Sequence, residues 1–262
     1  IGGKEKKDGW KLLFDGSTLN NWRADKWNKG GFSVIDGSIK CTGHASMLYY
    51  NGADKDFINF HFSADVMSKK GSNSGIFFHT KYQDRGWPVG HEAQVNCTQS
   101  DPVKTGSIYI VKKYLKQAHQ DDEWFHYEII VKGKLITTKI NGKVIATYYE
   151  KKHDGKRKLS SGTFGLQAHD PGSTAFYKNI KVKVLSNELS RADLVASRNG
   201  RWFNKMDFGP SLATSIAIGG EDILKGLAVR LGPTESHTMI YDTEMMSFNV
   251  AKKGFINIDG TP

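Results

Sequence analysis

The fold is set by two predicted strands and the loop that joins them in residues 72–96, SNSGIFFHTKYQDRGWPVGHEAQVN. Residues 74–80 have the β-branched and aromatic content of a buried strand. Residues 91–96 alternate, so that Glu92, Gln94 and Asn96 share one face and the intervening residues share the other. A carboxylate and two amides in mid-strand, next to a loop with Trp87 and Pro88, favour a sugar-binding surface, although a solvated face would have the same pattern.

The rest of the first 185 residues predicts a β-sandwich. The clearest alternation runs from Phe57 to Met67, and Asn141-Gly142 is a strong signal for a hairpin turn. Short strands with turn residues between them, and almost no helical periodicity, indicate an all-β jelly roll of two sheets with one concave face free for a ligand. The other predicted strands include 10–14, 32–40 around Asp36-Gly37, 47–50, 106–111, 124–131, 135–140, 143–149, 162–168 and 175–185.

Composition divides the chain into four parts. Residues 1–8 are charged and predict a disordered lead-in, residues 9–185 form the sandwich, and 186–200 have the low hydrophobicity of a linker. Residues 201–262 predict a small β-rich extension with strands at 216–218, 227–231, 239–241 and 255–258. About sixty residues form only a marginal core, so we expect this extension to dock on the sandwich or to continue beyond the chain.

Charge and cysteine content limit the classes of partner and cofactor. The net charge is +10, but the lysines are dispersed, and the one compact basic run, 151–158, predicts a solvated loop without a nucleic-acid motif. Cys41 and Cys97 are too few for a disulfide framework or a zinc site, although one bridge between them stays open. We expect no cofactor, no catalytic metal and no transmembrane segment. A structural Ca²⁺ held by loop oxygens is compatible with this architecture.

Seven sequence blocks in order carry a resemblance to the DUF1080 family, the 3-keto-disaccharide hydrolase domain. They begin at Gly9, Asn73, Glu92, Thr105, Asn141, Gly165 and Lys178, and read GWKLLFDGSTL, NSGIFF, EAQV, TGSIY, NG, GLQAH and KNIK. The resemblance implies a concanavalin-like jelly roll that acts on carbohydrates. It also implies functional positions at Asp65, Glu92, Gln94, Tyr109, Gln167 and His169.

Two positions depart from the family pattern. His79 stands where an arginine commonly follows the Gly-Ile-Phe-Phe strand, and His126-Tyr127 stand where Trp-Asn is common. A guanidinium that binds a hydroxyl or carboxylate in bidentate fashion is replaced by a shorter, titratable ring. The departure implies a changed substrate preference within the same reaction class.

Residues 198–262 resemble the opening of a domain found in multidomain proteins of environmental bacteria. The likeness rests on RWFNKMDFGP at 201–210, KGLAVRLG at 225–232 and YDTEMM at 241–246. It implies that the chain is the front part of a longer protein, and we expect a periplasmic or extracellular location. No Cys-x-x-Cys-His motif is present for haem attachment.

The reaction implied by the resemblance needs one base, one acid and polar groups for a ketone oxygen. In a 3-keto sugar the C2 proton is acidified, so a base can remove it while an acid assists the leaving group at C1, and water then adds. Glu92 is the candidate base, and His169 or Tyr109 is the candidate acid. The candidate substrate-binding residues are Asn73, His79, Gln94, Gln167 and, as an aromatic platform, Trp87.

Other readings of the same residues remain. Direct glycoside hydrolysis would pair Asp65 with Glu92, and the spacing of the carboxyl groups would decide between retention and inversion. The sandwich would equally suit a carbohydrate-binding module without turnover, or an interaction domain of a larger surface protein. Each candidate also has a structural alternative, such as a solvated Glu92, a His169 that braces the Asp170-Pro-Gly turn, or a core Tyr109.

Overall fold

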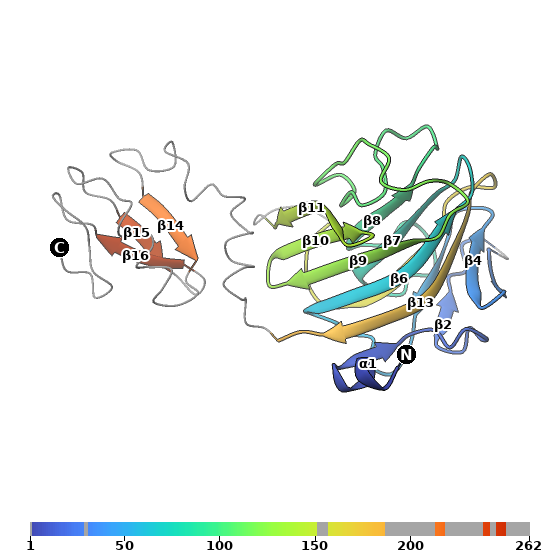
Figure 1. The fold of residues 1–262 in the computed structure, drawn as a ribbon, viewed down its shortest axis with the longest axis horizontal. Coiled ribbons are helices and arrows are strands. Elements are labelled where there is room, and N and C mark those ends of the chain that lie inside the picture. The colour runs from blue at the N-terminus through green and yellow to red at the C-terminus, as the bar shows by residue number, and fades with distance from the viewer. Residues whose placement is uncertain are drawn as a thin grey trace. The chain divides into compact units, whose positions relative to one another are not determined.

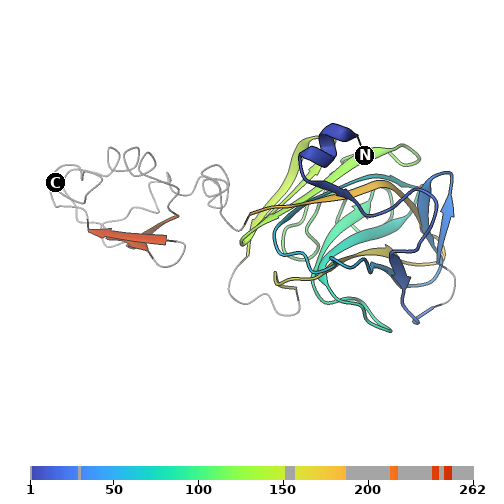
Figure 2. The ribbon, with the colours of Figure 1, turned by 90° about the horizontal axis from the view of Figure 1, so that it is seen from below.

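The computed structural model describes residues 2–28, 31–150 and 157–186, together with three short strands near the C-terminus. The chain divides into two compact units, Ile1–Asn187 and Glu188–Pro262. The division lies close to the predicted end of the sandwich. The first unit consists of two antiparallel sheets (Figures 1 and 2).

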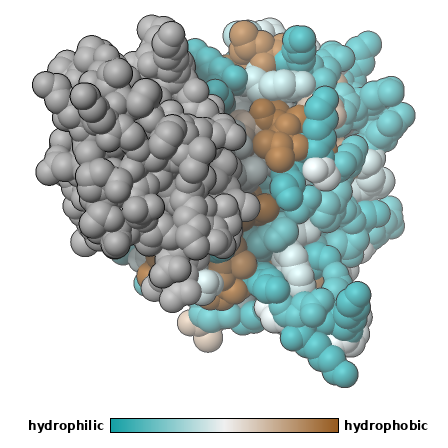
Figure 3. All heavy atoms as spheres, turned by 60° about the vertical axis from the view of Figure 1, so that its left-hand side comes forward, coloured by the Kyte–Doolittle hydropathy of each residue, from teal (hydrophilic) through white to brown (hydrophobic). Residues whose placement is uncertain are grey.

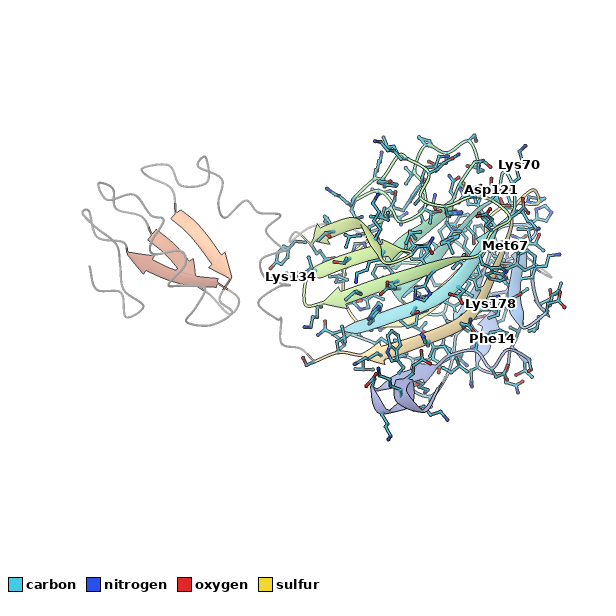
Figure 4. The ribbon with its side chains drawn as sticks, viewed as in Figure 1. Phe14, Met67, Lys70, Asp121, Lys134 and Lys178 are labelled. Atoms are coloured by element: carbon cyan, nitrogen blue, oxygen red, sulfur yellow. The ribbon has the colours of Figure 1, made fainter. Side chains whose placement is uncertain are left out.

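The larger sheet of the first unit has eight strands. Its order is β11-β10-β9-β6-β13-β4-β3, and β1 also pairs with β13. Met67 and Lys178 lie on its strands β6 and β13 (Figure 4). The strands are β1 (Trp10–Leu12), β3 (Phe32–Ile35), β4 (Ser38–Thr42), β6 (Phe60–Ser68), β9 (Phe125–Lys132), β10 (Leu135–Ile140), β11 (Lys143–Tyr149) and β13 (Thr174–Val184).

The smaller sheet has five strands in the order β2-β5-β12-β7-β8. Four of them, β5, β7, β8 and β12, are buried along their whole length. One face packs on the larger sheet, and the other is the candidate site. The strands are β2 (Trp22–Ala24), β5 (Ser46–Tyr50), β7 (Asn73–Thr80), β8 (His91–Asn96) and β12 (Thr163–Ala168).

The core between the sheets follows the alternation seen in the sequence. Phe60, Phe62, Ala64 and Val66 of β6 are all buried, as predicted, whereas Ile58 precedes the strand and is 54% exposed. Burial of these apolar side chains drives the two sheets together. The smaller sheet contributes Leu48, Tyr50, Ile76, Phe78, Ala93, Val95, Phe164 and Leu166 to the same core.

Hairpin turns were predicted best. β10 and β11 pair across Asn141-Gly142, and β3 and β4 pair across Asp36-Gly37. All four turn residues have positive φ, which Asn, Asp and Gly tolerate best. Cys41 and Cys97 are both free and buried, so the bridge that the sequence left open is not formed.

Two segments of the first unit differ from the prediction. The lead-in contains a short helix, α1 (Gly3–Lys7), in which Glu5 forms an ion pair with Lys181 of β13. Residues 106–111 are not a strand; only Ile108 forms isolated bridges, because Ile110 adopts a φ of 73° that breaks the extended chain.

The second unit has three described strands, β14 (Ala213–Ala217), β15 (Thr238–Tyr241) and β16 (Met245–Asn249). β14 pairs in parallel with β15, and β16 is antiparallel to both. β14 and β15 overlap the strands predicted at 216–218 and 239–241, whereas β16 was not predicted. The strands predicted at 227–231 and 255–258 lie outside the described residues.

The surface of the first unit is largely polar on the face drawn in Figure 3, where apolar areas are small and separated by hydrophilic side chains. Among the described residues, no helix has the length and apolar character needed to cross a membrane.

Candidate active site

The candidate site is built on the face of the five-stranded sheet that points away from the core. Because side chains alternate along a strand, residues next to core residues in sequence face this side. The cross-strand register places Gly75 opposite Gln94 and Phe77 opposite Glu92. We call this surface the site face; its residues are Met47, Tyr49, Asn73, Gly75, Phe77, Glu92, Gln94, Asn96, Gly165 and Gln167.

Glu92 lies over the backbone of β7 at Gly75. A Cβ atom on Gly75 would be only 2.5 Å from Glu92 Oε1. The φ of Gly75 does not lie in the left-handed region, so the backbone conformation does not require glycine there. The glycine leaves room for the carboxyl group, which is thereby fixed in the middle of the site face.

Burial controls the protonation of Glu92. The side chain is almost completely buried, and this desolvation raises the pKa of Glu92 to about 8. Arg157 Nη1 lies 3.9 Å from Glu92 Oε2 and opposes the rise, whereas Asp101 adds to it. Desolvation dominates because the Arg157 contact is long. Glu92 is therefore a carboxyl group that can exchange a proton near neutral pH.

Three of the buried polar atoms that have no hydrogen-bond partner among the described residues belong to Asn73 and Gln167 of the site face and to Arg157. They are Asn73 Oδ1, Gln167 Oε1 and Arg157 Nη1. An unpaired buried polar group costs about 1–3 kcal/mol, and most such groups in proteins are paired. Two acceptors and one cationic donor beside a buried carboxyl group suit a ligand with several hydroxyl groups and a carbonyl group.

Gln94 supports Glu92 from the neighbouring position on β8. Its amide satisfies the neighbouring acceptors when the nitrogen points to Glu92 Oε1 at 3.3 Å and to the carbonyl oxygen of Ser74 at 2.9 Å. In this orientation Gln94 holds the carboxyl group in place. Its side chain is buried, so it acts on a substrate mainly through Glu92.

Tyr109 lies beside Glu92 although it is not on a strand. Its backbone N–H donates to the carbonyl oxygen of Glu92 at 2.8 Å, and its hydroxyl donates to Asp101 Oδ2 at 3.2 Å. The Arg157 guanidinium lies 5.5 Å from the centre of the Tyr109 ring. Partial burial and the Asp101 charge raise the pKa of Tyr109, so its hydroxyl stays protonated and can donate.

His169 and Trp87 form the other part of the site. His169 follows β12 directly, two residues after Gln167, and its ring stacks on Trp87 with 5.7 Å between the ring centres. His169 Nδ1 lies 2.7 Å from Asp170 Oδ2. Trp27, which the sequence analysis did not select, packs edge-on against Trp87 at 5.0 Å.

Two sequence candidates lie elsewhere. His79 packs with Phe60 and Phe78, and both of its ring nitrogens are used by the backbone: Nε2 lies 2.8 Å from the Ile58 carbonyl oxygen, and Nδ1 accepts from Ser160 N–H at 3.1 Å. Burial lowers its pKa to about 4, so it is a neutral structural residue. It does not reach the site face, because the positive φ at His79 turns its side chain aside.

The structure does not bring Asp65 and Glu92 together. Asp65 lies on β6 between the core residues Ala64 and Val66, so it faces outward from the larger sheet, on the opposite side of the sandwich. It bonds His126 Nδ1 at 2.8 Å and Asn179 Nδ2 at 2.6 Å. The paired-carboxylate arrangement therefore has no basis here, and the departure at His126 also lies away from the site face.

Arg157, like Trp27, is a site residue that sequence reasoning missed. It belongs to the basic run 151–158, which predicts a solvated loop. Nothing in that run distinguishes one cation from the next, except that Arg157 is its single arginine.

The described residues offer no evident metal centre. Among them, no group of three or more His, Cys, Asp or Glu side chains is arranged to hold a metal ion. In the loop after β8, the Lys104 ammonium donates to the carbonyl oxygens of Gln99 at 2.7 Å and Asp101 at 2.8 Å. These two loop carbonyl oxygens are thus already hydrogen-bonded to a cationic side chain.

Comparison with known proteins gives both a family and a fold. The family model of the 3-keto-alpha-glucoside-1,2-lyase-like domain matches residues 9–183. The crystal structure of a candidate glycosyl hydrolase from Parabacteroides distasonis is similar with a TM-score of 0.62 at 23% identity, over 71% of this chain and 98% of that one. A second from the same organism has a TM-score of 0.54 at 20% identity, over 67% and 99%. No curated protein matches the chain.

Proposed function

Because the chain belongs to the 3-keto-alpha-glucoside-1,2-lyase-like domain family, we propose that its site face catalyses the cleavage of 3-keto-glycosides by elimination. The family places the domain among carbohydrate-active proteins. The observation that carries the finer proposal is the buried Glu92, with a pKa of about 8, beside three polar atoms that lack partners in the described chain.

In the proposed reaction, ionised Glu92 takes the proton from C2 of the sugar. The electron pair moves onto the C3 ketone and forms an enolate, whose negative oxygen Arg157 would stabilise. When the ketone re-forms, the C1–O bond breaks, a C1–C2 double bond appears, and the leaving oxygen takes a proton. Addition of water across that double bond would complete a net hydrolysis.

The elevated pKa of Glu92 suits this step. A base is most effective when its pKa lies near the working pH. At pH 7, about one unit below this pKa, roughly a tenth of the molecules carry the ionised carboxylate. Each ionised molecule is a stronger base than an ordinary exposed glutamate.

Tyr109 and His169 divide the remaining roles. The raised pKa of Tyr109 keeps its hydroxyl protonated in the free protein, and a backbone hydrogen bond holds Tyr109 next to Glu92. Its hydroxyl would therefore donate a proton to a group near the reacting carbons. His169 directly follows β12, two residues after Gln167, and we assign it to substrate binding together with Trp87. Asn73 and Gln167 would accept hydrogen bonds from sugar hydroxyl groups through their unpartnered oxygens.

Elimination is favoured over direct hydrolysis because it needs a single carboxylate. Direct hydrolysis uses two carboxyl groups that flank the bond. Asp65 lies on the other side of the sandwich, and Asp101 is engaged in its own loop, where Oδ2 accepts from Tyr109 and Oδ1 accepts from Val103 N–H at 2.8 Å.

The test uses a 3-keto-glucoside and the same substrate with deuterium at C2. We expect release of the leaving group, slower turnover of the deuterated substrate, and a loss of about 10²–10⁴-fold in rate in Glu92→Gln. Glu128→Gln, on the outer face of the larger sheet, serves as the control. Cleavage without an isotope effect would argue for direct hydrolysis, and binding without cleavage would favour a carbohydrate-binding module.

A further inference from the structure

Three aromatic rings form a continuous cluster at one end of the site face. Trp87 stacks on His169 with an interplanar angle of 22°, and Trp27 meets Trp87 edge-on at 83°. Trp87 is 44% exposed although it contacts both rings. We call these three residues the aromatic cluster. An exposed tryptophan held between two other rings offers a flat apolar surface of fixed orientation.

Carboxylates stabilise the segments that carry the three rings of the aromatic cluster. Asp25 accepts from the backbone N–H of Trp27 at 3.2 Å and from the backbone N–H of Met47 of β5 at 2.9 Å, which ties the backbone at Trp27 to the sheet. The loop that carries Trp87 is joined to the same segment by Asp84, whose carboxylate lies 3.1 Å from Lys26 Nζ and whose carbonyl oxygen accepts from Lys26 N–H. Asp170 holds the His169 ring.

Gln167 connects Glu92 with the aromatic cluster along the site face. The carboxyl group of Glu92 is over Gly75 and is hydrogen-bonded by Gln167. His169 is the second residue after Gln167, and alternate residues of an extended chain are about 7 Å apart. A sugar whose C2 faces Glu92 would therefore place a substituent of its ring against the aromatic cluster.

We propose that the aromatic cluster is a second binding subsite, which holds a ring in the leaving group at C1. This inference rests on the proposed function. The chemistry that the cluster recognises is a flat apolar ring face, which either a hexose or a phenolic group can supply. Trp87 is then a specificity-determining residue, because it contacts only the part of the substrate that departs.

The test compares three ligands with the same 3-keto-glucosyl group and a methyl, phenyl or glucosyl group at C1. Turnover kinetics are measured for the native chain and for Trp87→Ala. Calorimetric Kd values are measured for Glu92→Gln and for the double variant Glu92→Gln with Trp87→Ala. We expect Trp87→Ala to raise KM and Kd about tenfold, or about 1.4 kcal/mol, for at least one ring-bearing ligand. The methyl ligand should lose less affinity than that ring-bearing ligand.

Two further variants guard against misreading. Trp87→Phe keeps a ring and should retain most of the affinity. Trp124→Ala removes a tryptophan of similar exposure, 39%, which lies under Lys178 of the larger sheet, and should change nothing. The ligand with the larger loss identifies a hexose or a phenol as the occupant.

The inference is overturned if Trp87→Ala weakens all three ligands equally or weakens none. Absence of turnover with every ligand would sink the proposed elimination but would leave the Kd comparison to decide on the subsite. Ligands that fail to bind at all would overturn both.

Discussion

At the scale of single residues, the site depends on the balance between Arg157 and burial at Glu92. Burial raises the pKa of Glu92, and Arg157 lowers it. At position 79 the family pattern commonly has an arginine, whereas this chain has His79, which is buried in the core. The chain nevertheless brings a guanidinium to the site from a distant loop, and Ser160 of that loop bonds His79.

Removal of the Arg157 charge should change both the rate and its pH dependence. For the native chain, kcat/KM should rise with pH to a plateau above about 8, the pKa of Glu92. In Arg157→Met the pKa of Glu92 rises further, so the rising limb moves to higher pH. We also expect a loss of about 10²–10³-fold in kcat, as for other oxyanion donors.

The control for this prediction is Lys158→Met, which removes an exposed cation from the adjacent position. The pH profile of kcat/KM, measured for both variants, separates a local effect from a general loss of positive charge. Equal profiles in the two variants would show that Arg157 does not act on Glu92.

At the scale of elements, strand β7 provides the space that the proposed catalytic carboxyl group of Glu92 occupies. Gly75→Ala would place a methyl group 2.5 Å from Glu92 Oε1. Since the backbone tolerates alanine there, we expect the fold to remain and Glu92 to be displaced. The activity should fall by about 10²-fold, because small misplacements of catalytic groups are costly.

Gly165→Ala is the matched control, because its new methyl group would meet the flexible end of Met47 at 3.0 Å. Circular dichroism and initial rates of both variants check the prediction. Full activity of Gly75→Ala, with an unchanged fold, would mean that the position of Glu92 over β7 is unimportant for catalysis.

The same strands show how far sequence predicts this site. Alternation in β8 correctly placed Glu92 and Gln94 on one face, because a side-chain period of two survives any packing of the sheet. Alternation failed at residues 106–111, whose composition favours a strand but whose chain turns at Ile110. Those residues still lie along β8, since Gly106 and Tyr109 donate to its carbonyl oxygens.

Contacts between distant loops were beyond sequence reasoning. Arg157 and Trp27 reach the site only because the folded loops carry them there, and neither shows a periodic pattern. Asp65 was selected from a family pattern, but its place on β6 directs it to the opposite side of the sandwich.

At the scale of the whole molecule, the buried Glu92 should lower the free energy of unfolding as the pH rises. In the folded chain the pKa of Glu92 is about 8, against 4.5 for an ordinary glutamate in the unfolded chain. Below pH 4.5 the group is protonated in both states and costs nothing. Between these values only the unfolded chain ionises, so stability falls by about 1.4 kcal/mol per pH unit and levels off above pH 8.

Glu92→Gln removes this penalty, because a neutral amide does not have to lose its charge on burial. We therefore expect the variant to match the native chain near pH 4.5 and to exceed it by several kcal/mol, as an order of magnitude, at pH 9. Carboxylates with lowered pKa values, such as Asp54 and Asp170, act in the opposite direction at low pH. The contributions of Asp54 and Asp170 are the same in both proteins, so they cancel when the stability of the native chain is subtracted from that of Glu92→Gln at each pH.

Urea unfolding of both proteins at pH 5, 7 and 9, followed by the fluorescence of the sandwich tryptophans, measures the difference. The exposed Glu123→Gln serves as the control and should show a small difference that does not grow with pH. A flat difference curve for Glu92→Gln would mean that burial does not hold the proton on Glu92, and the rising limb of the activity profile would then need another residue. A curve that rises between pH 5 and 8 would tie stability and activity to the same carboxyl group, because the charge that the fold disfavours is the one that the proposed reaction requires.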